Sequence, residues 1–279
     1  MTANTDLTTV RDDIIELLHR VGAYVLSGLT NSKTINTKTS DFDAVTEYDH
    51  GSEAMLEEHL RRQYPAWGIV GEEGSRYRPD AEFVWYIDPI DGTNNFSHGV
   101  PFFAVSAGLW QRLADGSERP VLGVLYDPSR DELFHGIAGQ GAFSRYRGQE
   151  RRLQVSQINR LDKAIVGTGF PYDRATNPCN NLAEFSAFAP HVQGLRRLGV
   201  ASLDMTYVAA GRFDIYWEYG LHSWDIAAAV LFLQEAGGTL TTISGDLFVM
   251  KQDVEVASSN GLLHEQALAI LAGARAGRD

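Results

Sequence analysis

The sequence has few of the residues that would place it in several large classes of protein. It contains one cysteine, Cys179, so no disulfide can form within the chain and the fold does not require an oxidising compartment. The first residues lack the basic and apolar regions of a signal peptide. The apolar runs at 102–110 and 226–233 are too short to span a bilayer. We therefore expect a cytoplasmic protein that does not associate with membranes.

Positive charge is also scarce. Lys and Arg number 24 against 36 Asp and Glu, which gives a formal net charge of -12 at pH 7. Nucleic-acid-binding proteins usually carry a basic stripe, so this balance argues against a nucleic-acid partner. The sequence shows no Cys/His spacing typical of zinc sites and no P-loop with its Lys-Ser/Thr pair. A zinc protein and a nucleotide triphosphatase are therefore disfavoured.

The hydrophobic pattern predicts an α/β protein. With 279 residues and 44% hydrophobic residues, the chain can bury a sizeable core. Apolar periodicity predicts helices at 10–25, from Thr46 to 64, and at 181–188, 202–210, 224–236 and 264–272. Strands are predicted at 67–70, 83–87, 103–110, 121–126, 132–135 and 213–218, and the polar stretch 31–40 is predicted to be a loop. A polar cluster at 151–162 predicts an N-terminal half, 1–150, and a C-terminal half, 151–279, packed as one unit.

Acidic residues recur just past predicted strand ends or at helix starts. They are Glu72, Glu73, Asp88, Asp91 and Asp225, with Asp49 near the start of the second helix. Open α/β sheets bind ligands at strand ends, so these side chains are expected to share a site. Each cluster alone is equally typical of a charged turn or of a helix N-terminus. The prediction therefore depends on their combination.

A group of carboxylates is stable only when cations neutralise its mutual repulsion. An all-oxygen set selects hard ions such as Mg²⁺, Mn²⁺ or Ca²⁺. The calcium-loop template requires Gly at its sixth position, whereas Gly92 is at the fifth position counted from Asp88. Mg²⁺ leaves coordination positions for a substrate phosphate, and a helical turn at 92–96 would offer free N–H groups to it. These residues favour a magnesium-dependent enzyme that acts on phosphate esters.

Four segments resemble the inositol monophosphatases, a family within a wider group of lithium-sensitive, metal-dependent sugar phosphatases. They are 43–49 (Asp-Ala-Val-Thr-Glu-Tyr-Asp), 71–73 (Gly-Glu-Glu), 85–96 (Trp-Tyr-Ile-Asp-Pro-Ile-Asp-Gly-Thr-Asn-Asn-Phe) and 224–229 (Trp-Asp-Ile-Ala-Ala-Ala). The segments occur in the family's order and span most of the chain. The resemblance implies a layered α-β-α-β-α sandwich, a homodimer, and hydrolysis of a small polyol or sugar phosphate, with inositol monophosphate as the first candidate.

The resemblance also implies a role for each matching residue. Two or three Mg²⁺ ions, or Mn²⁺ as a substitute, would be bound by Glu72, Asp88, the carbonyl of Ile90, Asp91 and Asp225. The catalytic group would be Asp49 and Thr93, which orient the attacking water, with Glu72 near a looser ion and Lys38 on a loop beside the metals. The substrate would contact Asp91, Gly92, Thr93, Gly199, Val200, Ala201, Glu218 and Asp225.

The substrate stays open because the sequence departs from the family pattern beside Thr93 and near the proposed alcohol site. Asn94 replaces a usual Thr, and Val200 replaces a small polar residue. The segment 169–173 (Gly-Phe-Pro-Tyr-Asp) also resembles bacterial members of the family more than animal ones. Histidinol phosphate, fructose 1,6-bisphosphate and phosphoadenosine phosphate are alternatives. The last two would require additional basic residues, for which Arg174, Arg196 and Arg197 are candidates, although each is also typical of a surface charge.

Two alternatives involve no catalysis. A regulator that binds RNA or a protein complex is disfavoured by the acidic balance and by the complete set of metal carboxylates. A passive divalent-ion binder is disfavoured because Thr93 and Asp49 accompany those carboxylates.

Overall fold

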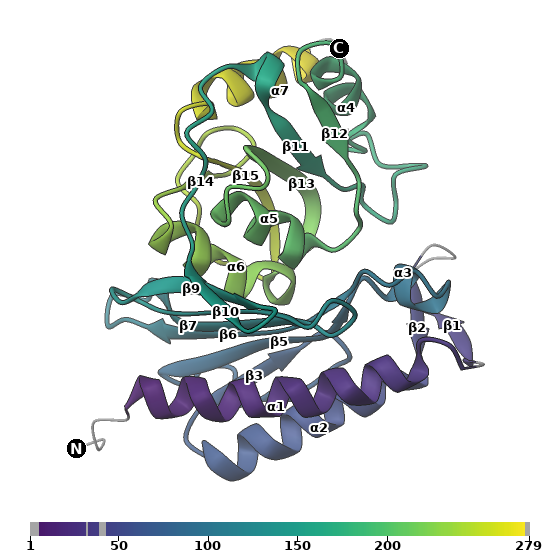
Figure 1. The fold of residues 1–279 in the computed structure, drawn as a ribbon, viewed down its shortest axis with the longest axis vertical. Helices are drawn as coiled ribbons and strands as arrows, with labels where there is room; N and C mark the ends of the chain where they lie inside the picture. The colour runs from purple at the N-terminus through teal and green to yellow at the C-terminus, as the bar shows by residue number, and fades with distance from the viewer. Residues whose placement is uncertain (1–5, 32, 39–42, 277–279) are drawn as a thin grey trace.

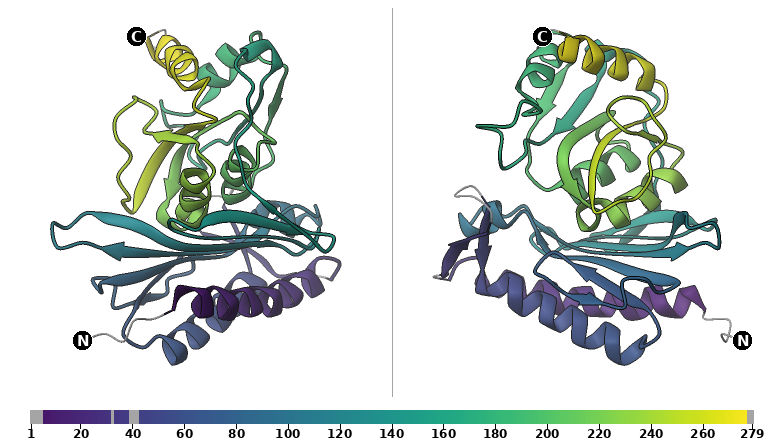
Figure 2. Two further views of the ribbon diagram at one scale, coloured as in Figure 1. Left: turned by 60° about the vertical axis from the view of Figure 1, so that its left-hand side comes forward. Right: turned by 180° about the vertical axis from the view of Figure 1, so that it is seen from behind.

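Two β-sheets and three layers of helices stack in the order α-β-α-β-α (Figure 1). The computed structural model describes residues 6–31, 33–38 and 43–276. Helices α1 (Leu7–Gly28) and α2 (Glu47–Gln63) cover the outer face of the larger sheet, as Figure 2 shows. Helices α5 (Ala201–Ala209) and α6 (Ser223–Glu235) lie between the sheets, and α4 (Leu182–Phe188) and α7 (His264–Ala276) lie beyond the smaller one. The predicted layered fold is confirmed.

The larger sheet is mostly antiparallel. Its strands are β3 (Gly68–Gly71), β4 (Arg76–Tyr77), β5 (Phe83–Asp91), β6 (Ala104–Arg112), β7 (Glu118–Asp127), β8 (Glu132–Ile137), β9 (Gly141–Tyr146) and β10 (Gln149–Arg152). Their order across the sheet is β10-β9-β8-β7-β6-β5-β3-β4, and β3 and β5 form its one parallel pair among the described residues. Because helices cover both faces, β5, β6 and β7 are buried over most of their length.

The smaller sheet follows in the sequence. Its strands are β11 (Ile165–Thr168), β12 (Gly194–Arg196), β13 (Ile215–His222), β14 (Thr239–Thr241) and β15 (Asp253–Ser259), in the order β12-β11-β13-β15-β14. A 3₁₀ turn at Leu161–Lys163 precedes β11, and the short helix α3 (Thr93–Ser97) follows β5. A separate ribbon pairs β1 (Ile35–Thr37) with β2 (Ala44–Thr46).

Helix α1 packs its apolar side on the larger sheet. Asp6 caps its N-terminus, since Asp6 Oδ1 accepts a hydrogen bond from the Thr8 amide at 3.0 Å. Ile14, Leu18 and Val21 recur at helical spacing and are fully buried. The helix predicted at 10–25 is therefore confirmed, and it extends from Leu7 to Gly28.

Helix α6 contacts both sheets and is buried along 226–233. It approaches the larger sheet closely because glycines face it. A Cβ on Gly108 of β6 would lie only 2.6 Å from the carbonyl carbon of Ala227. The apolar run 224–236 is thus an internal helix, as predicted. Within the described ranges, no helix combines the length and apolar character needed to cross a membrane.

Two predicted strand ends are wrong. Strand β5 continues past residue 87 to Asp91, so Asp88 and Asp91 lie within the strand and not beyond it. Strand β13 continues to His222, so Glu218 lies inside the strand and not at its end. In both strands the pairing register shifts at these acidic positions, between Asp88 and Asp91 and between Glu218 and Leu221. An irregularity in pairing leaves no simple periodic pattern to read.

Several strands were not predicted. Strands β10, β12 and β14 are short and have no buried residues, so they show no alternation of apolar and polar positions. The stretch 31–40, predicted as a loop, contains β1, whose three residues are exposed. Residues 32 and 39–42 of this region lie outside the described residues. The division of the chain at residue 150 stays a prediction.

Candidate active site

A pocket lies beside the irregular part of β5 and receives residues from both sheets. It is lined by Glu72, Asp88, Ile90, Asp91, Gly92, Thr93, Phe170, Pro171, Tyr172, Arg197, Gly199, Ala201, Glu218, Gly220, Leu221, His222 and Asp225. These positions span more than half of the chain and come from strands, helix starts and loops. The fold therefore brings together all five residues that the sequence resemblance assigns to metal binding.

The end of β5 supplies three of these groups. Asp88 is opposite Ser106 of β6 and Asp91 is opposite Ala104, so β5 contains one more residue than its partner here. In a regular strand, residues three apart point to opposite faces. The extra residue forms a bulge that lets Asp88 and Asp91 line the same pocket. The Ile90 amide donates to Asp88 Oδ1 at 3.0 Å, which fixes that carboxylate.

Two further carboxylates lie in the first turns of helices. Asp225 Oδ2 accepts a hydrogen bond from the His222 amide at 2.8 Å, as part of a capping box at the start of α6. Asp49 Oδ2 caps α2 in the same way, accepting from the amide of Thr46 at 2.8 Å and from its hydroxyl at 2.6 Å. Capping thus explains part of their presence, yet it leaves the other oxygen of each carboxylate for a second function.

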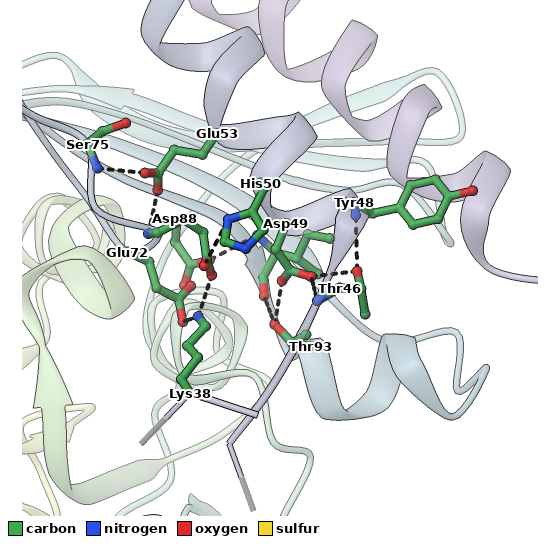
Figure 3. A network of polar contacts seen from close by, with 12 residues as sticks. Lys38, Thr46, Tyr48, Asp49, His50, Glu53, Glu72, Ser75, Asp88 and Thr93 are labelled. Carbon is green, nitrogen blue, oxygen red and sulfur yellow. Dashed lines mark hydrogen bonds and ion pairs between the residues drawn. The ribbon is translucent and has the colours of Figure 1, made fainter. Parts of the chain in front are cut away.

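Thr93 connects Asp49 to the strand end. Its Oγ1 lies 2.8 Å from Asp49 Oδ1 and 2.9 Å from the Ile90 carbonyl oxygen, and Figure 3 shows Thr93 beside Asp49. A hydroxyl has one hydrogen to donate, so it can serve only one of these acceptors fully at a time. Its lone pairs stay available to accept a hydrogen bond from a water molecule in the pocket.

Helix α2 holds the turn after β3 in place. The Glu53 carboxylate accepts hydrogen bonds from the amides of Glu73 and Ser75, each at 2.7 Å (Figure 3). Lys38 Nζ lies 2.9 Å from Glu72 Oε1 and also contacts Glu73 Oε1. Burial opposes the charge of Lys38, but these two carboxylates outweigh it and raise its pKa. Lys38 thus lies beside Glu72, as the resemblance implies.

Burial and mutual repulsion raise the pKa values of the pocket carboxyls. Burial raises the pKa of Asp88 well above its ordinary value, and the charges of Glu72, Asp91 and Asp225 raise it further. The same causes raise the pKa of Asp225. Burial raises the pKa of Asp91 to about 7, although the hydrogen bond from Ser202 opposes the shift. A bound cation would relieve this repulsion.

The donor atoms of the pocket are oxygens, which suit a hard divalent cation. Four carboxylates and the Ile90 backbone line one pocket, and oxygen ligands are those that Mg²⁺ prefers. In the described part of the chain, no three His, Cys, Asp or Glu side chains already form a complete metal-binding group.

Most of the predicted alcohol-binding residues line the pocket, and one does not. Gly199 and Ala201 line the pocket, whereas Val200 is fully buried and its side chain packs toward Gly92. Glu218 also lines the pocket, and its carboxylate accepts a hydrogen bond from the Tyr216 hydroxyl at 2.6 Å.

Burial raises the pKa of Glu218 to about 7, and the Tyr216 hydrogen bond and the charge of Arg197 oppose that rise. The group therefore changes its charge near neutral pH. A carboxyl of this kind can either accept a hydrogen bond from a substrate hydroxyl or, when protonated, donate one.

Some lining residues were not predicted. Phe170, Pro171 and Tyr172 follow β11 and form one wall of the pocket. They follow a strand, where α/β folds bind ligands, but β11 was itself not predicted, so this signal was missed. Arg197 was weighed only as a surface charge or a contact for a second phosphate, and nothing in its local sequence distinguishes it from Arg196.

Comparison with known proteins agrees with this geometry. The model of the inositol monophosphatase family matches residues 6–275. An inositol-1-monophosphatase of Caulobacter vibrioides is 42% identical over 233 residues, which cover 83% of this chain and 88% of the relative. A Pseudomonas aeruginosa protein named Nus factor SuhB is 42% identical over 217 residues, 76% of each chain.

A solved structure shows the same arrangement. The inositol monophosphatase from Anabaena (Nostoc) sp. has a TM-score of 0.81 at 37% identity, and the match covers 96% of this chain and 97% of that one. The predictions of family and enzyme class are confirmed. The chain belongs to the inositol monophosphatase family and is a phosphatase.

Proposed function

We propose that the protein hydrolyses phosphomonoesters of small polyols or sugars in a magnesium-dependent reaction, with inositol monophosphate as the first candidate substrate. The observation that supports this most directly is the Thr93–Asp49 hydrogen bond of 2.8 Å, because Thr93 lines the same pocket as the four carboxylates of the proposed metal site. A hydroxyl paired with a carboxylate positions a water molecule, whereas a site that only stores ions has no use for such a pair.

The carboxylates would form the metal site. Glu72, Asp88, Asp91, Asp225 and the Ile90 carbonyl would bind two or three Mg²⁺ ions, with Mn²⁺ as a substitute. Mg²⁺ at such a site would make a water molecule more acidic and would stabilise the charge that builds up on the phosphoryl oxygens.

The residues of the chain would then orient the reactants. Asp49 accepts the Thr93 hydrogen, so the Thr93 oxygen is left to accept a hydrogen from the attacking water. That contact directs an oxygen lone pair of the water toward phosphorus. Lys38 would offset part of the negative charge of Glu72 and Glu73 whenever fewer ions are bound. No covalent intermediate on the protein is required.

The alcohol part of the ester would extend toward Gly92, Gly199, Ala201 and Glu218. The Glu218 carboxylate suits hydroxyl groups of a polyol. Asp91 and Asp225 also line the pocket and would contact both phosphate and alcohol. A homodimer and a cytoplasmic location also stay predictions.

Other substrates of the same chemistry stay open. Histidinol phosphate, fructose 1,6-bisphosphate and phosphoadenosine phosphate would each meet the same phosphate-binding residues and differ only at the alcohol. Because one relative is named Nus factor SuhB, a non-catalytic regulatory function stays an alternative for this chain. The arrangement of Thr93 beside Asp49 and the carboxylates favours catalysis.

A panel of phosphomonoesters tests the proposal. Purified protein with Mg²⁺ should release phosphate from inositol 1-phosphate or a related ester, and EDTA should abolish the release. If no ester on a broad panel is hydrolysed with Mg²⁺ or Mn²⁺, the catalytic proposal is wrong. The ranking of kcat/KM across the panel identifies the preferred alcohol.

A further inference from the structure

Arg197 is a cation at the edge of an otherwise acidic pocket. Among the described residues that line the pocket, it is the one Lys or Arg, and it lies there with five carboxylates. The side chain is exposed to solvent. A positive charge at this place is not required by the phosphate end, where the carboxylates would bind cations of their own.

The backbone around Arg197 is held against the phosphate end. Asn95 Nδ2, on α3, donates to the Leu198 carbonyl and to the Phe102 carbonyl, each at 2.9 Å. This contact joins two segments that are about a hundred positions apart in the sequence. The Gly199 carbonyl also lies close to Gly92, since a Cβ on Gly92 would come within 3.4 Å of it. Arg197 is therefore carried by a segment fixed beside the start of α3.

Gly199 leaves room for the guanidinium group. A Cβ on Gly199 would lie 2.1 Å from Arg197 Nη1, and its φ of +78° is a conformation that favours glycine. The guanidinium thus lies over the backbone at Gly199, one of the predicted alcohol-binding residues. Its donors are available at the alcohol end of the pocket.

The guanidinium has no partner of its own. Across the described ranges, Arg197 makes no hydrogen bond or ion pair, and it acts on Glu218 and Asp204 only through its charge. Arg196 donates to the Leu195 carbonyl at 3.0 Å and does not line the pocket. Arg174 donates to the Pro171 carbonyl at 3.4 Å and is likewise outside the lining. Of the three candidate arginines, the fold places one in the pocket.

We infer that Arg197 is a specificity-determining residue that binds a second anionic group, a phosphate or a carboxylate, on the leaving alcohol. This inference rests on the proposed phosphatase function and names the class of alcohol. A guanidinium presents a planar fork that matches two oxygens of a phosphate or carboxylate, whereas a lone hydroxyl uses only one donor. A second anion placed near Glu218 would otherwise meet repulsion, which Arg197 offsets.

Matched substrate pairs test the inference. Fructose 1-phosphate and fructose 1,6-bisphosphate differ by a second phosphate, and glycerol 2-phosphate and 2-phosphoglycerate differ by a carboxylate. Arg197→Gln should lower kcat/KM for the doubly anionic member about 10- to 100-fold more than for its partner, the range typical of lost charge-assisted hydrogen bonds. Arg197→Lys keeps the charge but not the fork, and it should recover part of this selectivity. Arg196→Gln is the control and should change neither ratio.

The outcomes separate the possibilities. A selectivity loss in one pair alone supports the inference and identifies that anion as the ligand. If Arg197→Gln changes both members of each pair equally, the inference is wrong. A shifted pH profile for the singly anionic esters, with unchanged selectivity, would also contradict it, because Arg197 would then act only on the charge of Glu218.

Binding measurements distinguish this failure from a failure of the proposed function. Calorimetry with Mg²⁺ in a Thr93→Ala background, which removes the proposed water-positioning hydroxyl, compares the two sugar phosphates without relying on turnover. Weaker binding of the bisphosphate upon Arg197→Gln would support the inference even if the wild-type protein hydrolysed no ester. Equal binding with and without Arg197 would overturn it whatever the activity.

Discussion

The phosphate end of the pocket, formed by residues 72, 88–93 and 225, differs from the alcohol end, formed by residues 197–201 and 218. At the phosphate end, two carboxylates are fixed by a neighbour in sequence: Asp225 by the His222 amide and Asp88 by the Ile90 amide. The other two have distant partners, since the Ser202 amide donates to Asp91 and Lys38 donates to Glu72. At the alcohol end, a distant contact holds the segment that carries Arg197, because Asn95 donates to Leu198, 103 positions away. Glu218 is bound by its neighbour Tyr216. The phosphate end thus combines short local motifs with long-range contacts, whereas the position of Arg197 at the alcohol end depends on the tertiary fold.

This difference has a functional consequence. Changes at the phosphate end should lower the rate for every ester by a similar factor, because all substrates share the phosphate. Changes at the alcohol end should alter the ranking of esters. The proposed functional difference between the two ends is wrong if a variant at one end shows the kinetic behaviour expected of the other end.

The largest effect is expected for Asp225→Asn. It removes one charge from the proposed metal site, where stabilisation of the transition state is worth several kcal/mol, so kcat/KM should fall about 1,000-fold or more for all esters. Steady-state kinetics on three unrelated esters measures this. Asp12→Asn, on α1 and outside the pocket, is the control. A loss confined to one ester would place Asp225 at the alcohol end instead.

Thr93→Ala should lower kcat about 100-fold, again for every ester, because the hydroxyl that orients the water is lost. Thr93→Ser keeps the hydroxyl and should retain most of the activity. Rapid kinetics with saturating Mg²⁺ separates this effect from weaker metal binding. Equal rates for the Ala and Ser variants would mean that the hydrogen bond to Asp49 serves only the structure of the strand end.

Glu218→Gln should have a smaller, ester-dependent effect of about tenfold. The polyol esters should lose affinity, seen as a higher KM, because a charged acceptor for hydroxyl groups becomes neutral. An aromatic ester such as p-nitrophenyl phosphate has no alcohol hydroxyls and should be little affected. A uniform decrease across all esters would contradict the assignment of Glu218 to the alcohol end.

The smallest expected effect is a pH dependence of the stabilisation of the folded protein by Mg²⁺. The pKa of Asp91 is about 7 in the folded, metal-free protein against an ordinary value of 3.8, so between these values the folded state retains a proton that the unfolded chain has released. Metal-free stability should therefore fall as the pH rises through this window. Mg²⁺ binding requires the deprotonated form, so Mg²⁺ should raise Tm several degrees more at pH 8 than at pH 5.5.

Calorimetric unfolding with Mg²⁺ or EDTA at the two pH values tests this linkage. Asp91→Asn cannot titrate, and it should show a smaller difference between the two values. A Tm increase that is the same at both pH values in the wild-type protein would contradict the proposed coupling of metal binding to these carboxyls.

The sequence predicts the phosphate end well for a physical reason. Capping residues such as Thr46 encode their structure within a few positions. The irregular pairing of β5 between Asp88 and Asp91 is the exception, because its strand end was predicted too early. Long apolar helices like α1 and α6 are predictable in the same way, because their periodicity extends over several turns.

The alcohol end was predicted less well. Val200 lies between Gly199 and Ala201 in the sequence, yet its side chain is buried and does not line the pocket. Arg197 and Arg196 are adjacent and chemically identical, and only their different surroundings in the fold place the first in the pocket and the second outside it. Glu218 appeared to end a strand because the bulge in β13 interrupts the alternation that follows it. Tertiary contacts decide these positions, and no local pattern encodes them.

The central claim is tested most directly by measuring phosphate release from inositol 1-phosphate while Mg²⁺ is titrated into protein stripped with EDTA, for the wild type and for Asp225→Asn. The account predicts no release without metal, a saturable rise with Mg²⁺ in the wild type, and almost none in the variant. Release at the same rate in EDTA, or an Asp225→Asn variant as active as the wild type, would contradict it.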